Sequence, residues 1–191
     1  EQGELGVRGE AVMQGYVGGE TAFQNGYFMT GDIGTYRTID DRPFFFLIGR
    51  KKEIIIKGGI NISPIAVENW LKTLHEDIDQ VYAIGVPDER YGEEVGAVIV
   101  WKTRVNTVSS MRKLKMILVT KLSEPSAYET PRYFAQMKVE DLPQTSTGKV
   151  QRMELKTRIT TWESLYDILF SQEYTFHLIG QQSAHAETSR A

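Results

Sequence analysis

The 191-residue sequence contains no cysteine, which excludes disulfides, thiolate metal sites and a cysteine nucleophile. Its three histidines, His75, His177 and His185, are too widely separated for the ligand spacing of a zinc or iron site. No uninterrupted apolar run reaches the length of a membrane span. The net charge of −3 gives no reason to expect nucleic acid or an anionic membrane as a partner. We therefore expect no metal site, no nucleic-acid partner and no membrane span. The lack of disulfides favours a cytoplasmic location.

The composition is otherwise that of a globular protein. Hydrophobic residues make up 41% of the sequence, enough for an ordinary core, and the length allows one full domain and additional chain. The chain begins at Glu1 rather than at methionine and shows no secretory signal. We therefore expect a piece of a longer protein.

The first fifty or so residues are rich in glycine, aromatic residues and strand formers. Pairs of glycine, asparagine or aspartate predict the turns between the strands. The expected strands are 4–9 and 44–48, and the expected turns are 18–19, 25–26 and 40–41. Standing alone, such strands would expose much of their apolar face.

The pattern changes near Glu53 to that of a compact α+β unit. Ser63 is a good helix N-cap, and Pro64 suits the first helical position, where no amide donor is needed. Apolar residues at helical spacing continue to Leu74, and Ser109 or Ser110 is expected to cap a second helix. The expected strands are 53–57, 80–86, 95–102 and 133–139, with a turn-rich loop at 87–92, and the later helices are 111–122 and 151–159. These elements predict a central sheet of about three strands with flanking helices.

The last thirty or so residues have a different character. The spacing of their apolar residues predicts one more amphipathic helix. The residues of that apolar face are Trp162, Leu165, Tyr166, Leu169 and Phe170. After Gly180 the chain becomes small and polar, which is typical of a linker. We therefore expect residues 160–191 to form a helical extension and a linker that leads to another domain.

Three dense motifs follow one another along the chain. They are YFMTGD at 27–32, GRKKEIIIKGGINISP at 49–64 and PQTSTGKVQR at 143–152. Gly148 and Lys149 alone would suggest a nucleotide P-loop. That interpretation fails because no glycine stands five residues before Gly148 and Val150 replaces the required serine or threonine.

In this order and spacing, the three motifs resemble the C-terminal part of the adenylate-forming enzymes, a superfamily of acyl-CoA synthetases, nonribosomal adenylation domains and luciferases. The resemblance covers roughly residues 1–158. It implies an α+β fold in which residues 1–50 are the β-rich end of a large N-terminal adenylation domain. Residues 51–159 would then be a small, mobile C-terminal lid domain, and the N-terminal domain of the same chain would be its partner.

The resemblance assigns nucleotide-binding roles to Thr30, Asp32 and Arg50. A carboxylate accepts two hydroxyl donors well, so Asp32 suits a ribose diol. The planar guanidinium of Arg50 can reach ribose or phosphate oxygens. Taken alone, Asp32 could equally be a solvated turn residue and Arg50 half of a surface salt bridge.

The resemblance also assigns a hinge, a thiol-binding loop and a catalytic lysine. Lys52 matches the position about which the lid rotates between two half-reactions. Gly58 and Gly59 match a loop that lines the pantetheine tunnel, with Gly59 at its tightest point, although either could be a plain turn glycine. Lys149 matches the lysine that bridges carboxylate and phosphate oxygens as charge builds between them. Its alternative is a solvated surface lysine.

One position departs from the family pattern. Ala66 stands where the family usually has a glutamate, which would complete a capping box with Ser63. We expect a slightly weaker helix start and no effect on catalysis. Glu68, the second acidic position of the pattern, is retained.

These features predict a fragment of an ATP-dependent acid–thiol ligase, most similar to an acyl-CoA synthetase. It would use ATP, which becomes AMP, and a carboxylic acid. The acceptor would be CoA or the pantetheine of a carrier protein, and Mg²⁺ would be held outside these residues. The family's glycine-rich phosphate loop and acyl pocket belong to the N-terminal domain, so the fragment alone is expected to be catalytically incomplete and the acid is not named. Three alternatives remain open: a domain that loads a carrier protein, a luciferase-like oxygenase, and a degenerate scaffold.

Overall fold

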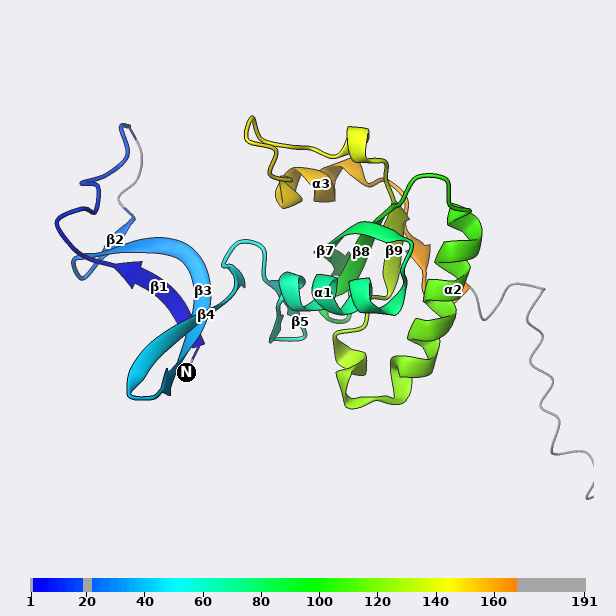
Figure 1. Ribbon diagram of the computed structural model, residues 1–191, viewed down its shortest axis with the longest axis horizontal. Coiled ribbons are helices and arrows are strands. Elements are labelled where there is room, and N and C mark those ends of the chain that lie inside the picture. The colour runs from blue at the N-terminus through cyan, green and yellow to red at the C-terminus, as the bar shows by residue number, and fades with distance from the viewer. Residues whose placement is uncertain (1, 19–21, 168–191) are drawn as a thin grey trace, which may run out of the picture.

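The structure is a computed structural model that describes residues 2–18 and 22–167. It contains an antiparallel sheet formed by the N-terminal residues and a separate α+β part that follows it in the chain (Figure 1). In the described part of the chain, no helix is long and apolar enough to cross a membrane. The α+β fold class expected from the sequence is confirmed.

The N-terminal sheet is built around one long strand. Its strands are β1 (Gln2–Val7), β2 (Phe23–Gln24), β3 (Tyr27–Ile39) and β4 (Arg42–Arg50). The other three all pair with β3 in antiparallel register. The turns expected at 25–26 and 40–41 are confirmed, since Asn25, Gly26, Asp40 and Asp41 all have positive φ angles, as primed hairpin turns require.

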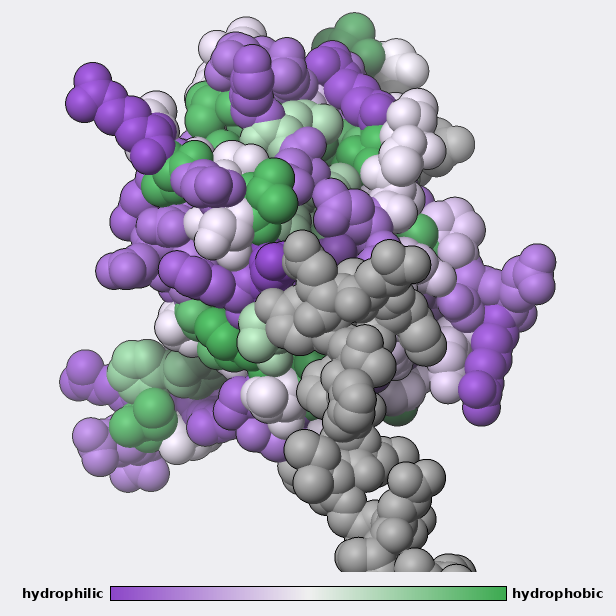
Figure 2. Space-filling view, turned by 90° about the vertical axis from the view of Figure 1, so that its right-hand side faces the viewer, coloured by the Kyte–Doolittle hydropathy of each residue, from purple (hydrophilic) through white to green (hydrophobic). Residues whose placement is uncertain are grey.

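The N-terminal sheet exposes large apolar side chains, as the sequence predicts. On β4, Phe45 and Leu47 are each 64% exposed. By contrast, the face of the α+β part shown in Figure 2 is mainly hydrophilic, and the hydrophobic residues visible on it are scattered. The apolar surface of β4 is therefore a feature of the N-terminal sheet.

The α+β part contains a second sheet with helices on both faces. Its strands are β5 (Ile55–Lys57), β6 (Ile60–Ile62), β7 (Ile78–Asp88), β8 (Gly92–Trp101), β9 (Tyr133–Gln136) and β10 (Glu163–Ser164). Its helices are α1 (Pro64–Leu74), α2 (Thr107–Thr120) and α3 (Arg152–Arg158), with short 3-10 turns at Lys121–Ser123, Pro125–Tyr128 and Val139–Asp141. The central strand β8 pairs with β7 and β5 in antiparallel fashion and with β9 in parallel.

The prediction of about three strands is wrong, because the described residues form a six-stranded sheet. The strand expected at 53–57 is β5, and the two strands that were not expected, β6 and β10, are only three and two residues long. Such short segments carry no periodic pattern. Strands β7 and β8 also extend into the loop expected at 87–92, which shrinks to a tight turn between Asp88 and Gly92.

The sheet is buried on both faces. Along β8, Ala97 and Ile99 join the core under α1 and α2, whereas Val98 and Val100 join a second core that includes Leu155 of α3. All four β8 residues are at most 1% exposed. This two-sided burial explains why β8 is a continuous apolar run rather than an alternating one.

The segment after residue 160 was expected to form a helix, but its described residues before Asp167 are not helical. Glu163 and Ser164 form β10, which pairs with Phe134 and Tyr133 of β9. Leu165 is fully buried in the core under α1 and α2, whereas Trp162 packs against the core on the other face of the sheet. An extended chain places these side chains on two faces, which a single helical face would not. Leu169 and Phe170 lie outside the described residues.

Helix α2 begins four residues earlier than expected, and the cap assigned to Ser109 or Ser110 is wrong. The Asn106 side chain accepts a hydrogen bond from the Ser109 amide at 3.0 Å and is the N-cap. The Ser110 hydroxyl instead donates to Asp77 at 2.6 Å. Asparagine and serine are about equally good caps, so their sequence positions alone did not decide between them.

This assignment predicts unequal costs for two neighbouring substitutions. Asn106→Ala is expected to lower the free energy of unfolding by about 1 kcal/mol, because it removes the cap of α2. Ser109→Ala, one turn later and exposed, is the matched control and is expected to leave stability within about 0.5 kcal/mol. Urea unfolding of the 191-residue chain measures both. A larger loss of unfolding free energy for Ser109→Ala than for Asn106→Ala would show that Ser109 is the N-cap instead.

Candidate functional site

Asp32 and Arg50 form a cross-strand pair where β4 ends beside the middle of β3. They are register partners on β3 and β4, and Arg50 Nε lies 2.9 Å from Asp32 Oδ1. The side chains are 30% and 63% exposed, respectively, so both can be reached from solvent. A carboxylate beside a guanidinium offers hydroxyl acceptors and phosphate donors together, which suits a nucleotide.

Thr30 supports this pair from within β3. Its hydroxyl donates to the Leu5 carbonyl at 3.0 Å and accepts a hydrogen bond from the Asp32 amide at 3.1 Å. Gly31, between them, has a φ of +75°, a conformation that L-residues rarely adopt. The structure thus brings Thr30, Asp32 and Arg50 together, with Thr30 shaping the turn that presents the Asp32 carboxylate.

Lys52 lies between two anchored neighbours. Before it, Lys51 Nζ pairs with Glu4 of the N-terminal sheet at 2.8 Å, and a hydrogen bond from Lys51 lowers the pKa of that carboxyl. After it, Glu53 pairs with Arg152 of the α+β part at 2.8 Å. Lys52 itself is exposed. Lys52, to which the resemblance assigns the hinge, thus lies between a residue paired with the N-terminal sheet and a residue paired with the α+β part.

The two glycines of the β5–β6 turn have different surroundings. Both have positive φ angles, +54° at Gly58 and +84° at Gly59. A Cβ atom on Gly58 would lie 2.7 Å from the Tyr128 hydroxyl, whereas a Cβ on Gly59 would meet no atom within 4 Å. In the structure the crowded glycine is thus Gly58, and the space beside Gly59 is open.

A buried lysine anchors this turn, a role that was not predicted from the sequence. Lys57 is 3% exposed, and its Nζ lies 2.6 Å from Glu94 and donates to the Tyr128 carbonyl at 2.9 Å. The same ammonium lies over the rings of Tyr128 and Tyr91, at 4.5 and 5.5 Å from their centroids. The Gly58 amide also donates to the Tyr91 carbonyl. The sequence gives only a weak signal that Lys57 is buried. Lys57 stands two residues after the buried Ile55, so the two side chains lie on the same face of β5.

Lys149 lies at the end of a tight, exposed turn. The Gly148 amide donates to the Thr145 carbonyl at 2.9 Å, and Gly148 has a φ of +78°. Thr145 holds the turn at both ends, because its amide donates to the Lys149 carbonyl and its hydroxyl accepts from the Lys149 amide. The backbone of Lys149 is thus fixed while its side chain is exposed. Among the described residues, no hydrogen bond or ion pair joins Lys149 to Asp32 or Arg50.

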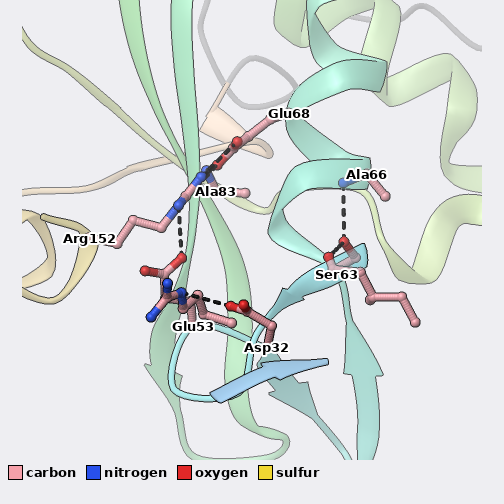
Figure 3. Close-up of polar contacts among 9 residues, drawn as sticks. Asp32, Glu53, Ser63, Ala66, Glu68, Ala83 and Arg152 are labelled. Carbon is pink, nitrogen blue, oxygen red and sulfur yellow. Dashed lines mark hydrogen bonds and ion pairs between the residues drawn. The ribbon is translucent and has the colours of Figure 1, made fainter. Parts of the chain in front are cut away.

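Three residues after Lys149, Arg152 joins Glu53 and Glu68 in a cluster of three charged residues (Figure 3). Arg152, at the start of α3, donates to both oxygens of Glu68 at 2.9 Å and to Glu53 at 2.8 Å. Burial raises the pKa of Glu68, and the charge of Arg152 and the Ala83 amide oppose that rise only in part. From the sequence, Glu68 was known only as a family position, and Glu53 and Arg152 had no predicted role. No local signal was available, since Arg152 lies 84 residues from Glu68 and 99 from Glu53.

Residues 66–149 match the family of AMP-binding enzyme C-terminal domains. The chain is 38% identical over 156 residues to the oxalate–CoA ligase of Arabidopsis thaliana, covering 79% of this chain and 28% of that protein. It is 35% identical to a mitochondrial medium-chain acyl-CoA ligase of Macaca fascicularis, covering 82% of this chain and 24% of that protein.

A solved structure shares the fold. The o-succinylbenzoate-CoA synthetase of Bacillus subtilis, in complex with its acyl-adenylate intermediate, superposes with a TM-score of 0.65 at 31% identity over 82% of this chain and 30% of that one. The chain thus spans less than a third of the length of these relatives. With three motifs in register, a matching domain and this fold, the chain belongs to the adenylate-forming, AMP-binding enzymes and contains their C-terminal domain.

Proposed function

We propose that the chain is part of an AMP-forming acyl-CoA synthetase. In this reaction a carboxylate attacks the α-phosphorus of ATP and releases pyrophosphate, which leaves an acyl-adenylate. A thiol then attacks the acyl carbon and releases AMP. The observation that carries the proposal is the joint presence of an accessible Asp32–Arg50 pair and an exposed Lys149 on a fixed turn.

Asp32 and Arg50 serve the nucleotide in this proposal. The Asp32 carboxylate accepts the ribose hydroxyls, and Arg50 donates to ribose or phosphate oxygens. Thr30 acts by holding the turn before Asp32. Mg²⁺ would enter with ATP, and we propose that its protein ligands lie outside these residues.

Lys149 serves the first half-reaction. Its ammonium bridges a carboxylate oxygen and an α-phosphate oxygen while negative charge develops between them. A side chain on an exposed turn can do this only when the turn faces the nucleotide. The proposal therefore includes rotation of a lid, residues 51–159, about Lys52 relative to residues 1–50.

The β5–β6 turn serves the second half-reaction. Gly58 is packed against Tyr128, and the open space beside Gly59 leaves room for a narrow pantetheine arm. CoA is the acceptor that we propose, because the relatives named above are CoA ligases by name.

The test uses the full-length protein of which this chain is part. Pyrophosphate release and acyl-CoA formation would be measured over a panel of carboxylic acids, with and without CoA. We expect one class of acid to give both products. Pyrophosphate without acyl-CoA would point to a carrier-protein acceptor, and no ATP turnover with any acid would support the scaffold alternative.

A further inference from the structure

The Arg152 guanidinium is held by two carboxylates from separate segments. Its Nη2 donates to both oxygens of Glu68 on α1 at 2.9 Å, its Nε donates to Glu68 at 3.3 Å, and its Nη1 donates to Glu53 at 2.8 Å. The Arg152 side chain is 19% exposed. Bidentate, partly buried contacts of this kind fix both the position and the plane of the guanidinium. Figure 3 shows Arg152 reaching between the two carboxylates.

Arg152 follows the Lys149 turn closely in the sequence, three residues after Lys149. The two ends of the turn are paired. Gln144 and Val150 form an isolated antiparallel β-bridge, and the Gln151 amide donates to the Pro143 carbonyl at 2.8 Å. Arg152 is the next residue and the first of α3. Any displacement of Arg152 is therefore passed through two residues to the backbone of Lys149.

The start of α3 has few other anchors. The helix has seven residues and no side-chain cap at Gln151. Leu155, one turn later, is fully buried and holds the helix to the sheet. The Arg152 contacts therefore fix the end of α3 that adjoins the Lys149 turn, and Leu155 fixes its middle.

Both carboxylates lie beyond Lys52 in the sequence, so the cluster belongs to the proposed lid and would move with it. Glu53 follows Lys52 directly, and Glu68 is on α1. Arg152 thus ties the Lys149 turn to the first residue after the proposed hinge. This contact can set where the lysine lies relative to the axis of rotation.

We propose that Arg152 is a positioning residue for Lys149, which holds the lysine turn at a fixed place relative to the hinge through Glu53 and Glu68. The proposal rests on the function proposed above, because it assigns Arg152 to the adenylation half-reaction. Arg152 does not touch the reacting atoms. It acts through the placement of Lys149, and its loss should impair the step that uses Lys149.

Arg158 supplies a matched control on the same helix. It pairs with Glu154 four residues earlier, and these side chains are 47% and 42% exposed. Its Nη1 also donates to the Asp141 carbonyl at 3.2 Å, an exposed contact to the segment before the turn, but Arg158 makes no contact with Glu53 or Glu68 among the described residues. Arg152→Met and Arg158→Met each remove one guanidinium and one charge from α3, but only the first breaks the contacts to Glu53 and Glu68.

The test compares half-reactions in the full-length enzyme. With Arg152→Met we expect acid-dependent pyrophosphate release to fall by about tenfold to 100-fold, because small misplacements of a catalytic group have effects of this size. Thioester formation from supplied acyl-adenylate and CoA should stay within about twofold, because Lys149 serves only adenylation in this account. Arg158→Met should leave both steps within about twofold. In a Lys149→Ala background, Arg152→Met should cause no further loss of adenylation.

Two further measurements separate positioning from general damage. Amide hydrogen exchange of residues 143–151 should be faster in Arg152→Met and unchanged in Arg158→Met, a readout that needs no activity. Glu53→Gln weakens one contact and leaves Glu68 in place, so it should fold normally and lower adenylation by a smaller factor than Arg152→Met.

The proposal would be overturned by equal losses in both half-reactions, by unchanged exchange in residues 143–151, or by a full additional loss in the Lys149→Ala background. A wild-type enzyme that turns over no acid would instead refute the proposed function, and the catalytic part of this inference with it. The exchange result would still show whether Arg152 fixes the turn.

Discussion

Lys149→Ala in the full-length enzyme is expected to slow acid-dependent pyrophosphate release by about 10²–10³-fold, the usual cost of removing one group that stabilises developing charge. The backbone of the turn should survive the substitution, because Thr145 holds it through main-chain atoms of Lys149. The loss would therefore report the ammonium rather than the loop. Single-turnover release of pyrophosphate from radiolabelled ATP measures it.

Lys138→Ala is the control for this substitution. Lys138 is another lysine of the α+β part, and its side chain is 79% exposed and 4.0 Å from Glu140. We expect its removal to leave pyrophosphate release within about twofold, since exposed pairs contribute little. A comparable loss in both variants would show that net positive charge, rather than Lys149, supports the reaction.

Lys57→Met is expected to destabilise the 191-residue chain by about 3–5 kcal/mol. The substitution keeps most of the side-chain volume but leaves Glu94, whose side chain is 6% exposed, without its ion-pair partner. An unpaired buried carboxylate is the source of this cost. The free energy of unfolding in urea measures the loss.

Two comparisons test that cause. The double variant Lys57→Met with Glu94→Gln removes the unpaired charge and should be more stable than Lys57→Met alone. Lys121→Met breaks an exposed pair with Glu124, at 34% and 45% side-chain exposure, and should cost at most about 1 kcal/mol. If the double variant were no more stable than the single one, lost packing against Tyr91 and Tyr128 would explain the effect instead of the charge.

The predictions that succeeded rest on local signals. Ser63 and Pro64 mark the start of α1, and the Ser63 side chain accepts a hydrogen bond from the Ala66 amide as an N-cap should. Asp40 and Asp41 form the predicted hairpin turn. The long apolar strands β7 and β8 were found with ends displaced by a few residues. Each of these features is encoded within a few neighbouring residues.

Other features of the fold depend on distant contacts that the sequence does not reveal. Strand β10 exists because Glu163 and Ser164 pair with β9, some thirty residues earlier in the chain. The burial of Lys57, on which the sequence gave no prediction, likewise depends on distant partners, because Glu94 and the Tyr128 carbonyl contact its ammonium. Partners this remote leave no periodic pattern in the sequence.

The candidate site divides in the same way. Thr30, Asp32, Arg50 and Lys149 lie in compact motifs that could be read directly from the sequence. The cluster of Glu53, Glu68 and Arg152 could not, because its members come from three segments that only the fold brings together.

The most direct test of this account measures both half-reactions in one variant. Full-length Lys149→Ala would be assayed for acyl-adenylate formation from acid and ATP, and separately for acyl-CoA formation from supplied acyl-adenylate and CoA. We predict that the first step falls by about 10²–10³-fold while the second stays within about twofold. Equal losses in both steps, or an unchanged first step, would contradict the assignment of Lys149 to carboxylate activation.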